Sequence, residues 1–293
     1  MLAILRIELL KIFRRPRTYI SFAAIAAMVG IVQLALKVDG ISYLEFLMGG
    51  IKDSIEIPYK VVLNGYLVCF IILNLLLIHV PLLVALVAAD SIAGEANMGT
   101  LRLLLTRPVS RTQFMLTKFA ACVIYTVMLL IWMALLSLLV SILLFGTNDM
   151  IITRNDVVEQ IQRNDILWRY IAAFAYAAVA LTTVAALAFL LSIFADNSIG
   201  PIVSTISIVI VLTILSEMQI PIYDETVKPW LFTSHMLAWK GFFYSKSNGE
   251  GEAIKGTIEN LPAIMKSMSV LIGYIVLFVG SAILIFRKKD ILS

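Results

Sequence analysis

Six long apolar stretches, separated by charged or polar segments, dominate the hydropathy pattern of this chain. They cover residues 18–36, 61–89, 119–145, 171–195, 200–216 and 267–286. A bilayer core about 30 Å thick requires about 20 apolar residues in a helix, and lipid offers no partner to unpaired backbone groups. The pattern therefore predicts an all-α membrane protein, with residues 1–17 before the first span and residues 18–293 forming one six-helix transmembrane domain.

Composition supports a membrane location and argues against a soluble fold. Hydrophobic residues make up 61% of the 293 positions and charged residues 14%, against about 45–50% and about 25% in soluble domains. A single soluble core stops growing near about 250–300 residues and could not hide so much apolar surface. The net charge of +4 does not indicate nucleic-acid binding, because the basic residues flank the apolar stretches.

The distribution of basic residues predicts the orientation of the spans. With both termini inside, the inner segments hold twelve Lys/Arg and five acidic residues, and the outer segments hold eleven Lys/Arg and fourteen acidic residues. The positive-inside rule therefore places both termini in the cytoplasm. A polar turn, Asp196-Asn197-Ser198, makes the fourth and fifth spans a tight hairpin.

The longest outer segment, residues 217–266, carries a cluster of aromatic residues. Rings with polar edges favour the membrane surface, so a surface position is the first interpretation and the lining of a substrate entrance the second. The cluster consists of Trp230, Phe232, Trp239, Phe242, Phe243 and Tyr244.

The segment before the first span has the periodicity of an amphipathic helix, at about 100° per residue. Its apolar face contains Leu2, Leu5, Leu9, Ile12 and Phe13, and its polar face contains Glu8, Lys11, Arg14 and Arg15. Such a helix would lie in the inner headgroup layer with its arginines against anionic lipid, and Pro16 would end it. The alternative is a plain basic flank that only fixes topology.

A short helix is also predicted between the second and third spans. Residues 99–107 place Leu101, Leu104 and Leu105 on one side, with Arg102 displaced from them. The leucine side requires an apolar groove on a partner. Three arginines near it can pair with acids of that partner, namely Arg102, Arg107 and Arg111.

The boundary of this short helix is rigid. Pro108 breaks the helix, and Ser110 followed by Gln113 fits a capping box that opens the third span. A short helix held in this way across two membrane helices is suited to transmitting a push from a soluble motor.

The same segment carries a recognisable motif, E…GTLRLLLTRPVSRTQF…K, and resembles the permease subunits of ABC-2 type transporters. The matching positions are Glu95, Gly99-Thr100-Leu101, Pro108-Val109-Ser110-Arg111 and Lys118. In that family the segment is a coupling helix that docks on the ATPase subunit. The N-terminal helix is similar to the family's elbow helix, where the matching residues are Leu5, Leu9, Lys11, Phe13, Arg14 and Arg15.

The resemblance implies a complete transporter with four subunits in the inner membrane. Two copies of an ABC ATPase would bind ATP and Mg²⁺, and a second permease, identical or related, would complete the path, with export as the favoured direction. This chain has no G-x-x-x-x-G-K-[ST] phosphate loop, so we expect it to bind no cofactor or metal and to have no enzymatic activity of its own.

Few polar side chains fall inside the predicted spans. Asn74, His79 and Thr205 are candidates for lining a translocation path. For His79, which precedes Pro81, a satisfied hydrogen bond between helices beside a proline kink is the favoured interpretation over a ligand site. Cys69 and Cys122 are expected to be buried thiols rather than a disulfide.

Two other classes of function remain open. A membrane anchor or receptor subunit without a motor fits the topology but assigns no function to the leucine and arginine residues of segment 99–111. An intramembrane enzyme fits less well, because the chain has neither a G-x-S-x-G nor an H-E-x-x-H motif and its only histidines are His79 and His235.

Overall fold

A computed structural model describes residues 2–47, 62–76, 78–100, 110–154, 157–218, 226–246 and 254–289. The elements in these ranges are α1 (Leu2–Arg14), α2 (Pro16–Leu47), α4 (Gly65–Leu75), α5 (His79–Asn97), α7 (Arg111–Ala134), η1 (Leu135–Val140), α8 (Ser141–Phe145), β1 (Met150–Arg154), β2 (Val157–Ile161), α9 (Arg163–Leu191), η2 (Ser192–Phe194), α10 (Ile199–Glu217), η3 (Lys228–Trp230), α12 (Phe232–Met236), η4 (Leu237–Phe243) and α13 (Leu261–Lys288).

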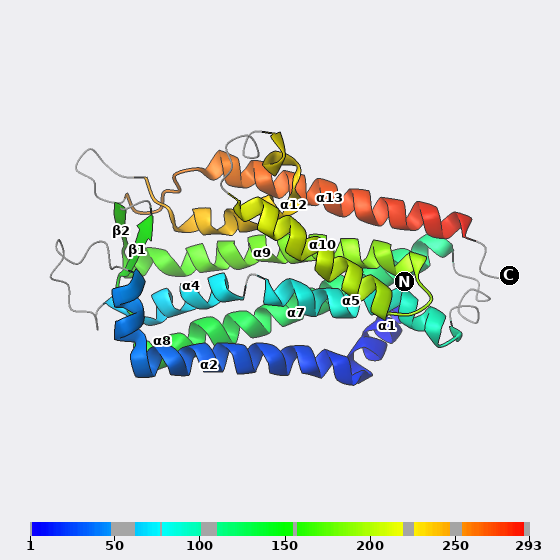
Figure 1. Ribbon diagram of the computed structural model, residues 1–293, viewed down its shortest axis with the longest axis horizontal. Coiled ribbons are helices and arrows are strands. Elements are labelled where there is room, and N and C mark those ends of the chain that lie inside the picture. Colours follow the sequence, from blue (N-terminus) through cyan, green and yellow to red (C-terminus); the bar gives the residue numbers. More distant parts are fainter. Residues whose placement is uncertain are drawn as a thin grey trace.

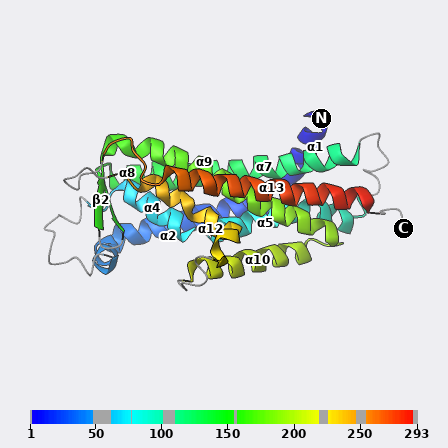
Figure 2. The same cartoon turned by 90° about the horizontal axis from the view of Figure 1, so that it is seen from above.

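The long helices run side by side in an elongated bundle (Figure 1). Both marked chain ends lie at one end of the bundle, which we call the termini end, together with α1. The strands β1 and β2 lie at the opposite end, which we call the hairpin end. Helix α10 runs along one side of the bundle (Figure 2), where it packs on α5 and α9.

The prediction of a multi-pass membrane protein is confirmed at the level of its helices. Six helices in the described ranges are long and apolar enough to cross a membrane: Pro16–Gly40, His79–Asn97, Arg111–Phe145, Arg163–Phe194, Ile199–Glu217 and Leu261–Lys288. In α5 and α9 the protein itself covers 67% and 61% of the apolar window, against 22–28% in the other four. These two helices therefore form the inside of the bundle, and the others surround them.

The second span differs from the continuous helix predicted over residues 61–89. It is broken into α4 and α5 around Leu76 and Ile78. Pro81 falls in the first turn of α5, where backbone N–H groups have no intrahelical partner, so its missing N–H costs little. The sequence predicted a kink at this proline, whereas the chain ends one helix and begins another.

The third span is longer than predicted, starting at Arg111 rather than near residue 119. It contains a π-helical stretch, η1, of the kind that marks irregular sites within helices. Gln33 of α2 is buried against it, and its side-chain amide donates to the Leu136 carbonyl and to Ser141 Oγ, both at 2.9 Å. A buried polar residue of the first span thus fastens α2 to the irregular part of the third.

A β-hairpin, which the sequence analysis did not predict, connects the third and fourth spans. β1 and β2 pair antiparallel with Met150 opposite Ile161 and Arg154 opposite Val157. The signal was present in the sequence, because β-branched residues on both sides of Asn155-Asp156 are typical of a hairpin with a two-residue turn.

The tight hairpin between the fourth and fifth spans is confirmed. α9 continues into η2, and α10 begins at Ile199 directly after Ser198. The Asn197 side chain accepts hydrogen bonds from the backbone N–H groups of Ile199 and Gly200, at 3.1 and 3.3 Å.

The aromatic segment before the last span turns three of its rings into the bundle, whereas the first interpretation had the cluster facing the membrane surface. Phe232, Trp239 and Phe243 are buried, and Trp230 alone of the cluster is largely exposed, at 74%. Trp239 and Phe243 pack against Phe70 of α4, with ring centroids 5.6 and 5.2 Å apart. The break in the second span and this returning segment therefore meet inside the bundle.

Candidate functional site

A cluster of charged side chains at the termini end joins α1, α2, α5 and α7. We call it the termini-end charge cluster. It contains three carboxylates and four cations, namely Glu8, Lys11, Arg15, Arg17, Asp90, Glu95 and Lys118. The carboxylates of Glu8, Asp90 and Glu95 are buried, so their charges must be balanced by nearby cations.

Lys118 is the centre of the cluster. Its side chain is only 1% exposed, and Nζ lies 2.8 Å from Glu8 Oε2 and 2.8 Å from Glu95 Oε1. The ammonium also donates to the Ser91 carbonyl at 3.0 Å. Lys11 of α1 bridges the same two carboxylates from the outside, at 2.8 Å from each. The amphipathic helix is thereby tied to both α5 and α7.

The two partners in α1 stabilise each other's charged forms. Burial alone would raise the pKa of Glu8, but Lys118 and Lys11 outweigh it and hold that pKa below its usual value. Burial would likewise lower the pKa of Lys11, but the hydrogen bonds to Glu8 and Glu95 raise it. Glu8 is therefore an ionised anchor at neutral pH.

Asp90 forms the second centre of the cluster. Arg17 lies 3.0 Å from Asp90 Oδ1, and Arg15 pairs with Oδ2 at close range. The Ser198 hydroxyl, just before α10, also donates to this carboxylate. Asp90 therefore links the start of α2 with α5 and the start of α10.

This arrangement corrects the expected orientation of the N-terminal helix. α1 is a helix, and Pro16 begins the next one, as predicted. However, Glu8 and Lys11 point toward α5 and α7 rather than toward lipid headgroups, while Arg14 is exposed. The predicted apolar residues Leu5, Leu9 and Phe13 are half-buried, because the helix packs with its polar face inward.

Both boundaries of the predicted coupling segment are fixed at the termini end. Gly99 has φ +68° and ends α5 as a left-handed cap, and the Thr100 hydroxyl donates to the Glu95 carbonyl at 3.3 Å. Ser110 accepts the Gln113 N–H at 3.2 Å and caps α7, as predicted. The middle of the segment lies outside the described residues, including Leu101, Arg102, Leu104, Leu105, Arg107 and Pro108.

Arg111 has partners within its own chain. Its guanidinium donates to the carbonyls of Arg287 at 3.0 Å and Lys289 at 2.9 Å, which lie at the end of α13. Free carbonyls at a helix C-terminus attract cations. Arg111 therefore joins α7 to the last span through contacts within the chain. The sequence had predicted that it pairs with an acidic residue of a partner.

Two buried polar atoms, Glu95 Oε2 of the cluster and Ser91 Oγ beside it, have no hydrogen-bond partner within the described part of the chain. Both residues border a cavity of about 30 Å³. The described residues contain no group of His, Cys, Asp and Glu side chains that could hold a metal ion. The short distances between its charged groups make the cluster a site of ion pairing, in which Glu95 Oε2 remains an available acceptor.

The three residues proposed for a translocation path each form a hydrogen bond within their own span. Each bonds a backbone carbonyl four residues earlier: Asn74 that of Phe70, His79 that of Leu75 and Thr205 that of Pro201. Because a carbonyl only accepts, His79 Nδ1 carries the proton. The favoured interpretation correctly gave His79 a satisfied hydrogen bond. The partner, however, is the Leu75 carbonyl just across the break in the same span, not a group on another helix. Cys69 and Cys122 are free and buried, as predicted.

At the hairpin end, Arg169 forms a second buried ionic site, which the sequence analysis missed. Its side chain is fully buried, and Nη2 lies 2.7 Å from Asp165 Oδ2. The guanidinium also donates to the carbonyls of Phe242 and Thr257, at 2.7 and 2.8 Å. The Asp165–Arg169 spacing of four residues at the start of a span was the available signal.

Comparison with known proteins places the chain in a family without assigning a function. A part of it is 30% identical over 120 residues to "Uncharacterized protein YhcI" of Bacillus subtilis (strain 168). That match covers 39% of this chain and 37% of the relative, so the chain spans well under half of the relative's length. The model of a family described as "Protein of unknown function (DUF2705)" matches residues 23–292. The chain therefore belongs to the DUF2705 family.

Proposed function

We propose that this protein is the membrane-spanning permease subunit of an ATP-driven transporter whose ATPase is a separate polypeptide. The observation that carries the proposal is the fixing of both boundaries of the 99–111 segment at the termini end. Glu95, four residues before Gly99, is tied to α1 and α7, and Arg111 is tied to α13. A force on this segment would reach four helices through ionic and hydrogen-bonded contacts.

The mechanism follows from these contacts. ATP-driven closure of two ATPase subunits would push the leucine face of residues 99–107, with Arg102 and Arg107 paired to acids of the ATPase. Glu95 would pass the push to Lys11 and Lys118, and its unpartnered Oε2 would accept a new donor as the helices shift. ATP and Mg²⁺ belong to the partner subunits in this scheme, and a second permease completes the path.

The same proposal includes an orientation in the inner membrane. The Lys/Arg excess at the inner segments supports a cytoplasmic location of the termini end, with the charge cluster. The hairpin end and the aromatic segment then belong to the outer side, as export would require. Exposed apolar side chains on α2, α10 and α13, such as Ile31, Val203 and Val276, supply the surface for lipid or for the second permease.

The proposal is tested by changing the leucine face. The full chain is purified from its native membranes as wild type, as the double variant Leu104→Asp with Leu105→Asp, and as a matched control with both residues changed to Ile. We expect wild type and control to retain a P-loop ATPase that hydrolyses ATP, and the aspartate variant to lose it about ten-fold or more, since charges are excluded from an apolar groove. Equal recovery with all three would refute the coupling role.

The side of the membrane is checked with the variant Leu104→Cys. Because Cys69 and Cys122 are buried, a membrane-impermeant thiol reagent should react at residue 104 only from the cytoplasmic side. Labelling from the outside, or a wild-type protein that never retains an ATPase, would favour the motor-independent anchor instead.

A further inference from the structure

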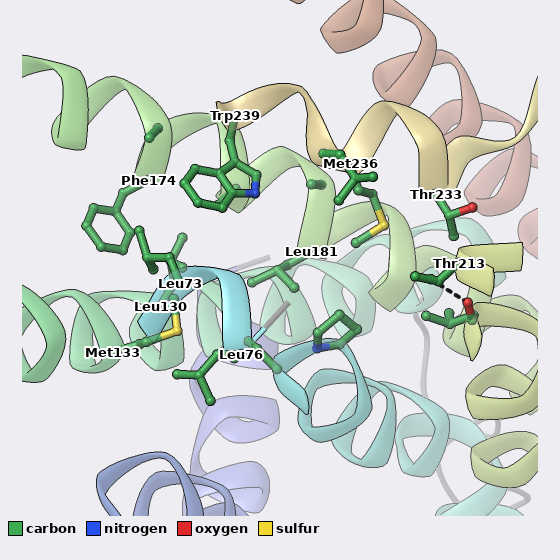
Figure 3. A pocket seen from close by; sticks show the side chains of 17 residues that line it. Leu73, Leu76, Leu130, Met133, Phe174, Leu181, Thr213, Thr233, Met236 and Trp239 are labelled. Carbon is green, nitrogen blue, oxygen red and sulfur yellow. Dashed lines mark hydrogen bonds between the residues drawn. The ribbon is translucent and has the colours of Figure 1, made fainter. Parts of the chain in front are cut away.

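An apolar chamber of about 70 Å³ lies where the broken second span faces the returning aromatic segment (Figure 3). Leu76 and Pro81, on either side of the break, form part of one wall. Met236 of α12 and Trp239 of η4 form part of another, and Leu181 of α9 lies between them. None of the described residues assigned to the proposed coupling role, such as Glu95 and Arg111, lines this chamber.

The chamber results from the two irregularities of the fold. A continuous helix over residues 61–89 would have run straight through this region, but α4 ends at Leu75 and α5 begins at His79. The segment after α10 turns back into the bundle, as the burial of Phe232, Trp239 and Phe243 shows. Protein interiors contain few spaces larger than a water molecule, and one of them lies between these elements.

The chemistry of the wall selects an uncharged ligand. No charged side chain lines the chamber in the described part of the protein. The two lining hydroxyls are committed to backbone carbonyls, Thr213 to Val209 at 2.7 Å and Thr233 to Leu212 at 2.9 Å. A charged or strongly polar molecule would lose its hydration here without gaining partners.

One hydrogen-bond donor in the wall is unused. The indole N–H of Trp239 forms no hydrogen bond with any described residue, although Trp239 is only 6% exposed. Figure 3 shows the nitrogen edge of the ring on the side away from Phe174, toward Met236. The nitrogen is not one of the fully buried polar atoms without a partner in the described part of the chain, so the N–H is reachable from the chamber and is suited to a single oxygen acceptor on a ligand.

The chamber is also accessible. Several lining residues are half-buried rather than buried, including Phe174, Ala177, Thr213 and Leu237. An apolar cavity of this kind stays dry and accepts apolar molecules, since water would find too few polar partners. A ligand restores dispersion contacts that the lining side chains lack.

We propose that this chamber binds the part of one alkyl chain of an amphiphile that adjoins a neutral oxygen, since about 70 Å³ holds only a few methylenes, with that oxygen accepting a hydrogen bond from the Trp239 indole N–H. The inference requires no ATPase and is independent of the transport role proposed above. The alkyl chain can belong to a bilayer lipid or to a separate amphiphile, and both present the same chemistry to the wall.

The experiment uses the purified full chain in lipid nanodiscs and a photoreactive dodecan-1-ol with a diazirine in its alkyl chain. Labelled residues are identified by peptide mass spectrometry. We expect labelling near Met133 and Met236, two flexible side chains of the wall, and suppression of that labelling by excess unmodified dodecan-1-ol. Labelling at lipid-facing positions such as Leu143 should not be suppressed, because bulk lipid does not saturate.

Matched variants on α9 test whether the chamber itself is the site. Ala177→Leu adds a larger side chain to the lining. We expect the affinity for dodecan-1-ol, measured by competition, to fall about ten-fold, because an overpacking cost of about 1.4 kcal/mol corresponds to a factor of ten. Ala175→Leu makes the same change two residues away on an exposed position and should leave competition unchanged. Trp239→Phe keeps the ring and removes the donor, so the affinity for the alcohol should fall about two- to ten-fold, while that for the corresponding diazirine alkane should not.

The source of the alkyl chain is decided by repeating the labelling with a diazirine phosphatidylcholine in the nanodisc. Labelling of Met133 and Met236 by this lipid, lost in Ala177→Leu, assigns the chamber to a bilayer lipid and supports the proposal. Labelling by the alcohol alone assigns it to a separate amphiphile and also supports it. Labelling that no competitor suppresses, or that Ala177→Leu and Ala175→Leu affect equally, would overturn the proposal.

Discussion

The two ends of the bundle each contain a buried ionic site, but the two sites connect different kinds of segments. At the termini end, Lys118 joins residues that lie far from it in the chain, with Glu8 110 residues away, and the cluster holds four helices together. At the hairpin end, Arg169 pairs with Asp165 in its own helix and fastens backbone of residues 242 and 257 to that helix. One site connects helices, and the other attaches a loop to one helix.

The ends also differ in how fully their polar atoms are used. Asp165 accepts hydrogen bonds on both oxygens, from Trp168 and Gly256 as well as Arg169. Glu95 leaves one oxygen without a partner among the described residues, beside a small cavity. A fully paired site resists rearrangement, whereas a partly paired one can change partners at lower cost. The difference indicates that charged side chains can rearrange more easily at the termini end than at the hairpin end.

The largest effect is expected from removing the centre of the termini-end charge cluster. Lys118→Met leaves two buried carboxylates with Lys11 as their remaining cation, and we expect a loss of about 3–5 kcal/mol in the free energy of unfolding. Unfolding in mixed micelles measures it. Lys11→Met is the control, since its side chain is 34% exposed and Lys118 stays in place. A cost as large for Lys11→Met would show that the cluster is not centred on Lys118.

For Arg169→Met we expect the free energy of unfolding to fall by about 3 kcal/mol. The loss is somewhat smaller because Asp165 keeps its hydrogen bonds from Trp168 and Gly256. Release of the segment around Phe242 and Thr257 should accompany it, measurable as faster proteolysis or hydrogen exchange there. Arg163→Met, on an exposed position of the same helix, should stay within about 0.5 kcal/mol of wild type. Unchanged exchange in Arg169→Met would contradict the fastening role.

The smallest effect concerns backbone packing at the hairpin end. A Cβ on Gly65 would lie 2.6 Å from the backbone of Ile142, so Gly65→Ala should cost about 1–3 kcal/mol by separating α4 from α8. Gly273→Ala in α13 meets nothing within 4 Å and should stabilise its helix by up to about 1 kcal/mol. The same unfolding measurement compares them, and equal effects would mean that α4 and α8 do not need this close approach.

Local chemistry explains which features the sequence predicted. The six membrane helices follow from the length of the apolar stretches, since lipid leaves backbone groups no other partner. The break between α1 and α2 follows from Pro16, the cap of α7 from Ser110, and the turn before α10 from Asn197. Each of these depends on residues within a few positions of one another.

Features that depend on distant residues were missed or misplaced. The inward orientation of Glu8 requires Lys118, and the burial of Trp239 requires the break near Leu76 and the ring of Phe70. Periodicity shows that a helix has a polar face, but it does not show whether lipid headgroups or a buried lysine will meet that face. The π-helical stretch that receives Gln33 left no sign in the local pattern either.

The amino-acid sequence by itself determined that six helices of this chain are long and apolar enough to cross a membrane, because helix length and side-chain hydropathy are matched to lipid without reference to other segments. Only the tertiary structure decided that the charges near the termini meet inside the protein and that a broken span and a returning segment enclose an apolar chamber. The physical reason is that pairing of buried charges and packing of helix ends depend on residues up to 110 positions apart, whose meeting no local pattern encodes.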